Sequence, residues 1–104
     1  MNETKSWGYM KTSVPTVDLL EQTHAFPCPY VFKAIGKADQ GFLARVVAAV
    51  REELNFEIDP PSRVREAVGG RHLSITLEPV VQSAQQVLAV YRRLRMLEGL
   101  VMLF

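Results

Sequence analysis

The hydrophobic pattern after residue 25 changes from the period of a strand to the period of a helix. Residues 30–36 are mostly β-branched or aromatic, which predicts a strand with Pro27 and Pro29 at its entrance. Behind Asp39, the expected N-cap, apolar residues recur at spacings of three, four and seven and predict an amphipathic helix. Its apolar stripe consists of Leu43, Val46, Val47, Val50 and Leu54.

Two further strands and a tight turn follow this helix. Residues 62–68 and 71–78 both have strand-like composition, and Gly69 and Gly70 between them predict a hairpin turn. Apolar and polar residues alternate in the second of these strands, so one of its faces is expected to lie on the core. The core-facing residues are Leu73, Ile75 and Leu77, and the outward-facing residues are His72, Ser74 and Thr76.

The end of the chain predicts a second helix and a last strand. Ser83 and Gln86 have the spacing of a capping box, and an apolar stripe at helical spacing continues from there to Leu94. Gly99 is expected to end this helix. Residues 100–104 are all apolar and predict a final strand.

The order of these elements is strand, helix, strand, strand, helix, strand. Two right-handed crossovers of this kind form a ferredoxin-like βαββαβ sandwich. This is an α+β fold in which a four-stranded antiparallel sheet carries both helices on one face. Its first and third strands are central, and its second and fourth strands are edges. We therefore expect a single domain of this fold over residues 26–104.

The first 25 residues show no sustained hydrophobic period. Pro15 interrupts any long helix, although a short helical turn fits residues 17–21. Residues 1–25 are therefore expected to be a flexible N-terminal tail. The alternative is an arm that lays Trp7 and Tyr9 on its own domain or on a second subunit.

Composition narrows the classes of function. The chain has 104 residues, of which 48% are hydrophobic, and a formal net charge of +1, so bulk charge provides no general attraction to nucleic acid or anionic membranes. Cys28 is the only cysteine, which excludes an intramolecular disulfide and a cysteine-cluster metal site. The apolar runs are too short to span a bilayer, and the first residues lack a signal-peptide pattern. We expect a cytoplasmic protein without a metal or cofactor.

Residues 26–36 read Phe-Pro-Cys-Pro-Tyr-Val-Phe-Lys-Ala-Ile-Gly. This segment resembles the opening of the YbeD-like family of small uncharacterised bacterial proteins. Residues 70–76 with their Ser-x-Thr, and residues 83–94 with their Val-Tyr-Arg-Arg-Leu, resemble its hairpin return and its second helix. The resemblance implies a ferredoxin-like fold related to ACT regulatory domains, and it implies no catalytic residues.

A second resemblance suggests where a ligand would bind. Residues 39–46 are similar to the loop-to-helix segment of ACT domains, where a glycine lets a ligand approach the backbone. The resemblance implies a regulatory module that receives a small anionic ligand near the start of the first helix. The residues expected to bind it are Gly36, Asp39, Gln40, Gly41 and Arg45.

Two alternatives share this fold. The spacing of Gln40, Gly41 and Arg45 is similar to that of the phosphate-cradling loop of acylphosphatases, which implies a small hydrolase. Those enzymes also need an Asn on the second strand, where this chain has Glu66, so we expect a protein that is not an enzyme. The second alternative is an RNA-recognition motif, which stacks bases on aromatic residues of its first and third strands. Residues 71–77 contain no aromatic residue, which argues against nucleic acid as a partner.

Apolar surface without an expected cover favours association. The last strand is apolar on both faces although the topology makes it an edge, and unprotected edges pair with other chains. We expect a homodimer, or the docking of a protein partner, through this strand or through the open face of the sheet. The residues expected at the interface are Val31, Ile35, Ser74, Thr76, Leu100, Met102 and Phe104.

Overall fold

The computed structural model describes residues 14–39, 41–67 and 69–104. Within these ranges the chain forms three helices and six strands, and every strand pair is antiparallel. In chain order the elements are α2 (Val17–Thr23), β1 (Cys28–Pro29), β2 (Phe32–Lys37), α3 (Phe42–Glu53), β3 (Ser62–Glu66), β4 (His72–Leu77), β5 (Val80–Val81), α4 (Ala84–Arg95) and β6 (Leu100–Leu103).

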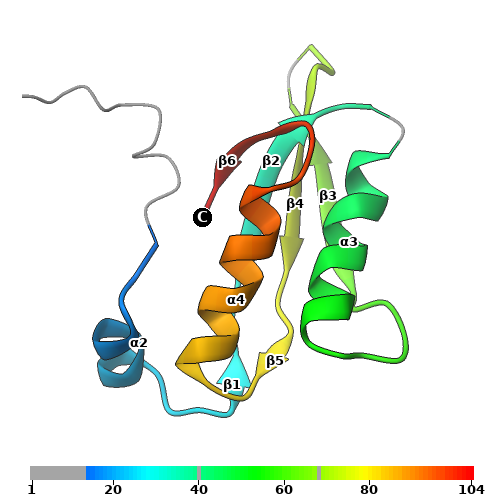
Figure 1. Cartoon of the computed structure of the whole chain (residues 1–104). Coiled ribbons are helices and arrows are strands. Elements are labelled where there is room, and N and C mark those ends of the chain that lie inside the picture. The colour runs from blue at the N-terminus through cyan, green and yellow to red at the C-terminus, as the bar shows by residue number, and fades with distance from the viewer. Residues whose placement is uncertain (1–13, 40, 68) are drawn as a thin grey trace, which may run out of the picture.

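The main sheet confirms the ferredoxin-like prediction. Its strand order is β3-β4-β2-β6, so the first and third long strands are central and the other two are edges. Helices α3 and α4 lie side by side on one face of this sheet, and none of the described helices covers the opposite face (Figure 1). The strand boundaries move inward from their predicted positions by one or two residues at several ends.

The core lies between the sheet and these two helices. The alternation of the central strands puts Phe32 and Ala34 of β2, and Ile75 and Leu77 of β4, on the helix side, where all four are buried. Leu73 was expected to be buried with them and is half-buried. The reason is that it pairs with the end of β3, all of whose residues are exposed. The helices therefore cover the centre of the sheet and leave β3 open.

The start of α3 differs from the prediction. The N-cap is Gly41 rather than Asp39, and it makes no side-chain capping bond. The Asp39 carboxylate is used in the loop before the helix, where Oδ1 accepts a hydrogen bond from the Gly41 N–H at 2.9 Å. A side chain that bridges two residues of a turn in this way competes with helix capping for the same donors.

Helix α4 keeps half of the expected capping box. Ser83 is its N-cap, and Ser83 Oγ accepts a hydrogen bond from the Gln86 N–H at 3.1 Å. The reciprocal bond goes one residue further back, since Gln86 Oε1 accepts from the Gln82 N–H. The helix ends at Arg95 with Met96 as its C-cap, before the predicted stop. Gly99 instead forms the turn into β6. Its φ is 90°, a backbone conformation that glycine adopts at little steric cost.

Part of the segment that precedes the sheet packs against the domain and contributes to its core. The expected tail covers residues 1–25, but Val17–Thr23 form helix α2, which lies against α4 and buries Leu20 in the core. Thr16 caps this helix by accepting a hydrogen bond from the Leu19 N–H. Residues 1–13, including Trp7 and Tyr9, lie outside the described residues. Among the helices that are described, none is long and apolar enough to cross a membrane.

Candidate functional site

The loop between β2 and α3 is held by an ion pair. Arg45 Nη2 lies 2.9 Å from Asp39 Oδ2, so the helix binds the carboxylate of the loop that precedes it. The same Nη2 donates to the backbone carbonyl of Glu98 at 3.0 Å, in the turn between α4 and β6. Arg45 therefore joins two turns that are far apart in the sequence.

This geometry favours the charged form of Asp39. The hydrogen bond from Arg45, and then the one from the Gly41 N–H, hold the pKa of the Asp39 carboxyl below its ordinary value of 3.8. Because the folded pKa lies below the unfolded one, these interactions contribute stability above pH 3.8. That stability is lost as the pH falls through the folded pKa. Solvent screens the pair, since the Arg45 and Asp39 side chains are 32% and 47% exposed.

Gly36 faces the core in this arrangement. A Cβ atom built on Gly36 would overlap Cζ of the Phe42 ring, whose side chain is fully buried. The close approach of this ring to the backbone of β2 therefore explains the glycine. This contact also holds Phe42, the first residue of α3, against the sheet.

The structure brings together only part of the predicted ligand site. Asp39, Gly41 and Arg45 are in direct contact, whereas Gly36 is buried against Phe42, and Gln40 lies outside the described residues. The guanidinium group that was expected to meet an anion already binds the Asp39 carboxylate. The ion pair accounts for these residues without a ligand, and ligand binding at this loop stays a prediction.

Strand β6 forms one edge of the sheet and carries exposed apolar side chains. Among the strands of the described ranges, β6 pairs with β2 alone. Val101 is 41% exposed and Phe104, just beyond the strand, is 50% exposed. The register changes between Ile35, which pairs with Met102, and Gly36, which pairs with Leu100, so Val101 is the extra residue of a β-bulge. The regular part of this edge is therefore short and lies at the end of the chain.

The open face of the sheet has an apolar half and a basic half. Because Phe32 and Ala34 of β2 point toward the helices, the residues between and beyond them point to the other face. On the β6 side this face is apolar, with Val31, Ile35, Met102 and Phe104. On the β3 side it is basic and hydroxylated, with Lys33, Arg63, Arg65, Ser74 and Thr76.

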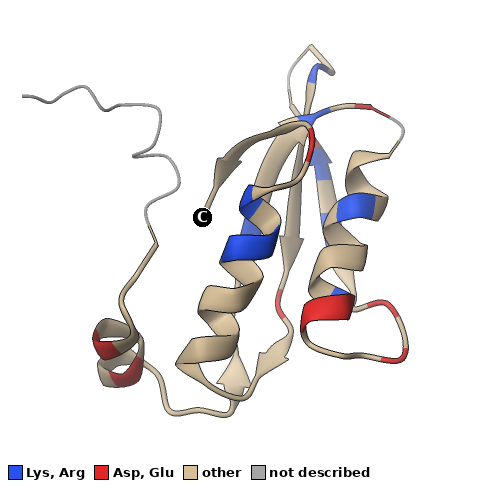
Figure 2. Cartoon of the chain, in the orientation of Figure 1, with Lys and Arg blue, Asp and Glu red and all other residues tan. Residues whose placement is uncertain are grey.

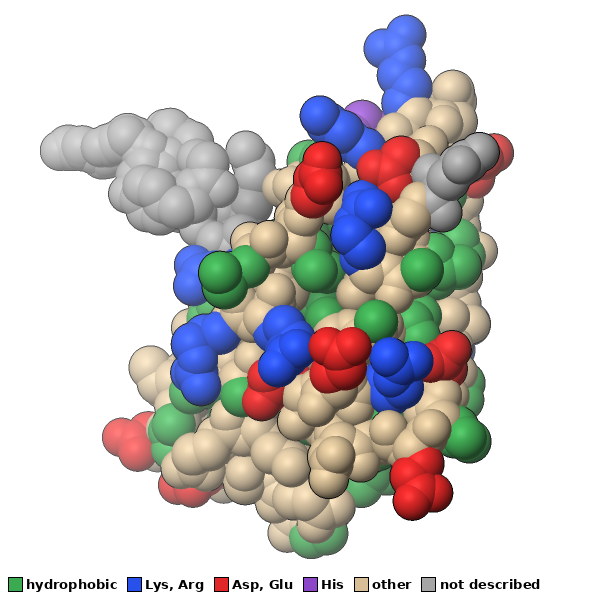
Figure 3. Space-filling model, turned by 45° about the vertical axis from the view of Figure 1, so that its right-hand side comes forward, with side chains coloured by type: hydrophobic (Ala, Val, Ile, Leu, Met, Phe, Trp, Pro, Cys, Tyr) green, Lys and Arg blue, Asp and Glu red, His purple; other side chains and the backbone are tan. Residues whose placement is uncertain are grey.

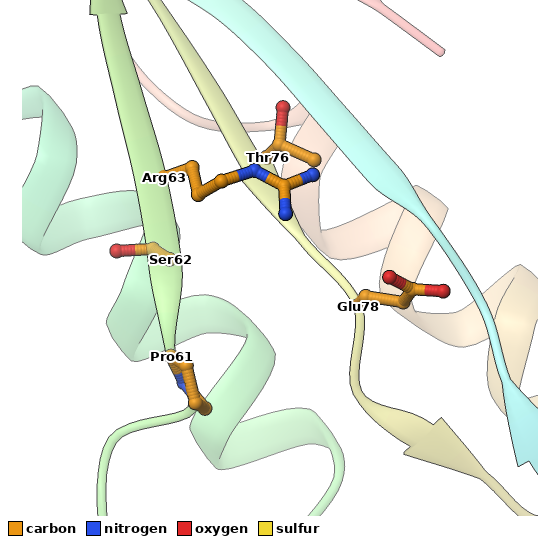
Figure 4. Close-up of a pocket in the computed structure, with 5 residues that line it drawn as sticks. All are labelled: Pro61, Ser62, Arg63, Thr76 and Glu78. Atoms are coloured by element: carbon orange, nitrogen blue, oxygen red, sulfur yellow. The ribbon is translucent and has the colours of Figure 1, made fainter.

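The basic half contains two adjoining hollows. One has a volume of about 280 Å³ and is lined by Lys33, Arg63, Val64, Arg65, Ser74 and Thr76. The other, of about 240 Å³, shares Arg63 and Thr76 with it and reaches Glu78. Figure 4 shows the Arg63 side chain reaching from β3 across β4 beside Thr76, with Glu78 farther along the same strand end.

The cations of this basic half were not among the residues that the sequence predicted for a site. The local signal was the Arg-x-Arg pattern of Arg63 and Arg65, which puts two like charges on one face of a strand. The third cation, Lys33, is 30 positions away from Arg63 in the sequence and becomes a neighbour only through the register of β3, β4 and β2.

Comparison with known proteins identifies the family. Residues 21–104 match the model of a family described as a protein of unknown function, DUF493. A UPF0250 protein of Shewanella amazonensis is 33% identical over 79 residues, which cover 76% of this chain and 88% of the relative. A UPF0250 protein of Shewanella woodyi is 36% identical over 74 residues, covering 71% of this chain and 82% of the relative.

The chain belongs to the DUF493 family. The resemblance to small uncharacterised bacterial proteins of the YbeD-like family is thereby confirmed. The matched segment begins within α2 and includes the whole of the main sheet and both of the helices that cover it. The family match therefore covers the β6 edge and the basic hollows alike.

The helix side of this DUF493 domain differs in charge from its open face. Arg51 Nη1 pairs with Asp59 at 2.7 Å, and Arg93 pairs with Glu52 and Glu53 at 3.1 and 2.9 Å. Figure 3 shows basic (blue) and acidic (red) side chains next to one another on the face that this view presents. Figure 2 shows acidic residues at the end of α3 and in the loop that follows it, as well as on α2, and basic positions on β3.

The histidines and the cysteine of the DUF493 domain do not form a reactive group. His24 lies against Phe26 and Tyr30, with ring centroids 5.9 and 5.2 Å apart, and His72 is on the open face. Cys28 is half-buried in β1. Over the described ranges, no three His, Cys, Asp or Glu side chains come together as a metal-binding group. The expectation that the protein needs no metal stays a prediction.

Proposed function

We propose that this domain is a small interaction module that associates with a second copy of the chain through the edge of β6. The single observation that supports this proposal is a strand edge that no other described strand pairs with and that is bordered by exposed apolar side chains. Val101 and Phe104 belong to this edge, and Val31 is 48% exposed on the adjoining apolar half of the open face. Pairing of two edges satisfies backbone N–H and C=O groups and removes apolar surface from water.

A two-fold axis at β6 suits the charge distribution better than stacking of two open faces. Stacking would place the Lys33, Arg63 and Arg65 side chains of one copy against the same side chains of the other. Like charges brought together in this way oppose association. Pairing at β6 keeps Arg63 and Arg65 of β3 at the far edge of the sheet, with β4 and β2 between them and the interface, and leaves only Lys33 on the strand next to β6.

The oligomeric state of the full chain tests the proposal. We expect light scattering at several concentrations to show a dimer for the unmodified chain. Val101→Lys and Phe104→Lys should shift it to a monomer, because a charged side chain on an edge disfavours pairing with another strand. The matched control is Ile58→Lys, which charges another exposed apolar side chain, 79% exposed, in the loop after α3 and should leave the dimer unchanged.

A monomer at every concentration, both for the full chain and for a shorter version without its first residues, would rule out the association model, as would a dimer that survives both β6 substitutions. A version that begins at Val14 keeps α2 and removes residues 1–13. If only this shorter version forms a dimer, the β6 edge is available for pairing but is covered by the first residues in the full chain. Comparing the two lengths therefore separates association from an internal cover.

A further inference from the structure

We propose that the basic half of the open face binds the phosphate group of a small phosphorylated metabolite. The site consists of Lys33, Arg63 and Arg65 with the hydroxyl groups of Ser74 and Thr76. This inference concerns a different part of the sheet from the β6 edge and does not depend on dimer formation. Its failure and the failure of the proposed association can therefore be told apart.

The strand register places the cations around the hydroxyl groups. Thr76 of β4 pairs with Arg63 of β3 on one side and with Lys33 of β2 on the other. Neighbouring strands lie about 4.8 Å apart, so the two cations begin roughly 10 Å from each other with Thr76 between them. Arg65 stands beside Ser74 in the next row. The side chains of Lys33 and Arg63 can thus both contact an anion that is bound above Thr76.

These cations lack the counter-charges that neutralise the arginines on the helix side. Arg45, Arg51 and Arg93 each bind a carboxylate at 3.1 Å or less. Among the described residues, Lys33, Arg63 and Arg65 take part in no ion pair within 4.0 Å. Three like charges on one face repel one another, and an oxyanion with two negative charges relieves this repulsion through charge-assisted hydrogen bonds.

The shape of the site favours a small ligand over a nucleic acid. The cations gather around a hollow of about 280 Å³, which accommodates a phosphate with a short substituent. The open-face positions of the two central strands are Lys33, Ile35 and Lys37 on β2 and His72, Ser74 and Thr76 on β4. None of these side chains is aromatic apart from the imidazole of His72, so the face lacks the pair of Phe, Tyr or Trp rings on which single-stranded bases stack.

Titration of the full chain with inorganic pyrophosphate tests the site. We expect saturable changes in the NMR amide signals of Arg63, Ser74 and Thr76 at constant ionic strength, because pyrophosphate offers the same oxyanion chemistry as a phosphorylated metabolite. Replacing both arginines, Arg63→Gln with Arg65→Gln, should weaken binding about tenfold or more. The matched control Arg92→Gln removes an exposed cation from α4 and should leave the affinity unchanged.

A second variant protects the test against a simple loss of folding. Glu78 lines the adjoining hollow beside Arg63, so its carboxylate repels an incoming anion. Glu78→Gln should tighten pyrophosphate binding about twofold to threefold, a gain that a folding defect cannot produce.

Three results would overturn the proposal. The first is the absence of saturable signal changes, and the second is an equal loss of affinity in the Arg92 control. The third is that an oligothymidylate of twelve nucleotides binds to the same amino-acid residues more tightly than pyrophosphate does. That result would assign the surface to single-stranded nucleic acid instead.

Discussion

At the scale of single residues, the loop after β2 shows how the same residue types serve either binding or structure. Gly36, Gly41 and Arg45 have the composition of an anion-binding loop. In the folded chain Gly36 makes room for the Phe42 ring, and Arg45 binds Asp39 and the Glu98 carbonyl. These contacts hold α3 and the turn before β6 in place relative to the sheet.

We expect Gly36→Ala to lower the free energy of unfolding by about 1–3 kcal/mol, because the new methyl group overlaps a buried ring that has little room to move. Combining it with Phe42→Leu should cost less than the sum of the two changes, which denaturant unfolding can measure. Gly41→Ala is the control, since its Cβ would come closest to Arg45 Nη1, at the end of a flexible side chain that can move away. This account would be contradicted if the losses in free energy of unfolding from Gly36→Ala and Phe42→Leu were fully additive. A larger loss from Gly41→Ala than from Gly36→Ala would contradict it as well.

At the scale of elements, α2 is the part of the structure that the hydrophobic pattern described least well. It has seven residues, which is too short for a stable isolated helix in water. Leu20 is nonetheless 2% exposed, because the helix lies against α4 and shares the main core. Packing against the rest of the core therefore stabilises a helix that is too short to be stable by itself.

Leu20→Ala should lower the free energy of unfolding by about 2–5 kcal/mol, as expected for a large-to-small change in a core. Leu19→Ala is the matched control on the same helix, since Leu19 is 51% exposed and its truncation should change stability by less than about 0.5 kcal/mol. Thermal or denaturant unfolding of both variants provides the measurement. Equal effects at the two positions would show that α2 does not pack as described.

At the scale of the whole molecule, the two halves of the sheet differ in how well they are covered. The central strands β2 and β4 are paired on both sides and contribute buried side chains. Every residue of β3 is exposed, and the side chain of Val64 on this strand is 46% exposed. A strand with so few buried contacts is expected to open more easily than the centre of the sheet.

Hydrogen exchange measured by mass spectrometry should therefore show faster exchange in residues 62–66 than in residues 72–77. The difference follows from pairing, since β3 is bonded on one side only and β4 on both. Protection of β3 equal to that of β4 in the free protein would mean that the open edge is covered, contrary to the fold described above.

The sequence by itself determined the local elements and the faces that they bury. Alternation along β4 predicted that Ile75 and Leu77 lie on the core, and helical spacing predicted that Val46 and Val50 do so as well. These patterns are readable because the side-chain periods of strands and helices depend only on nearby residues. The pattern of elements was then enough to select a ferredoxin-like topology.

Only the tertiary structure decided which distant residues meet. Arg45 binds the carbonyl of Glu98, 53 positions away, and Lys33 joins Arg63 across Thr76 through the pairing of three strands. The burial of Leu20 likewise depends on a helix that comes much later in the chain. Such contacts depend on strand register and on how separate elements pack, which nearby sequence does not specify. For this reason the sequence predicted the fold, whereas the basic hollow emerged only from the folded sheet.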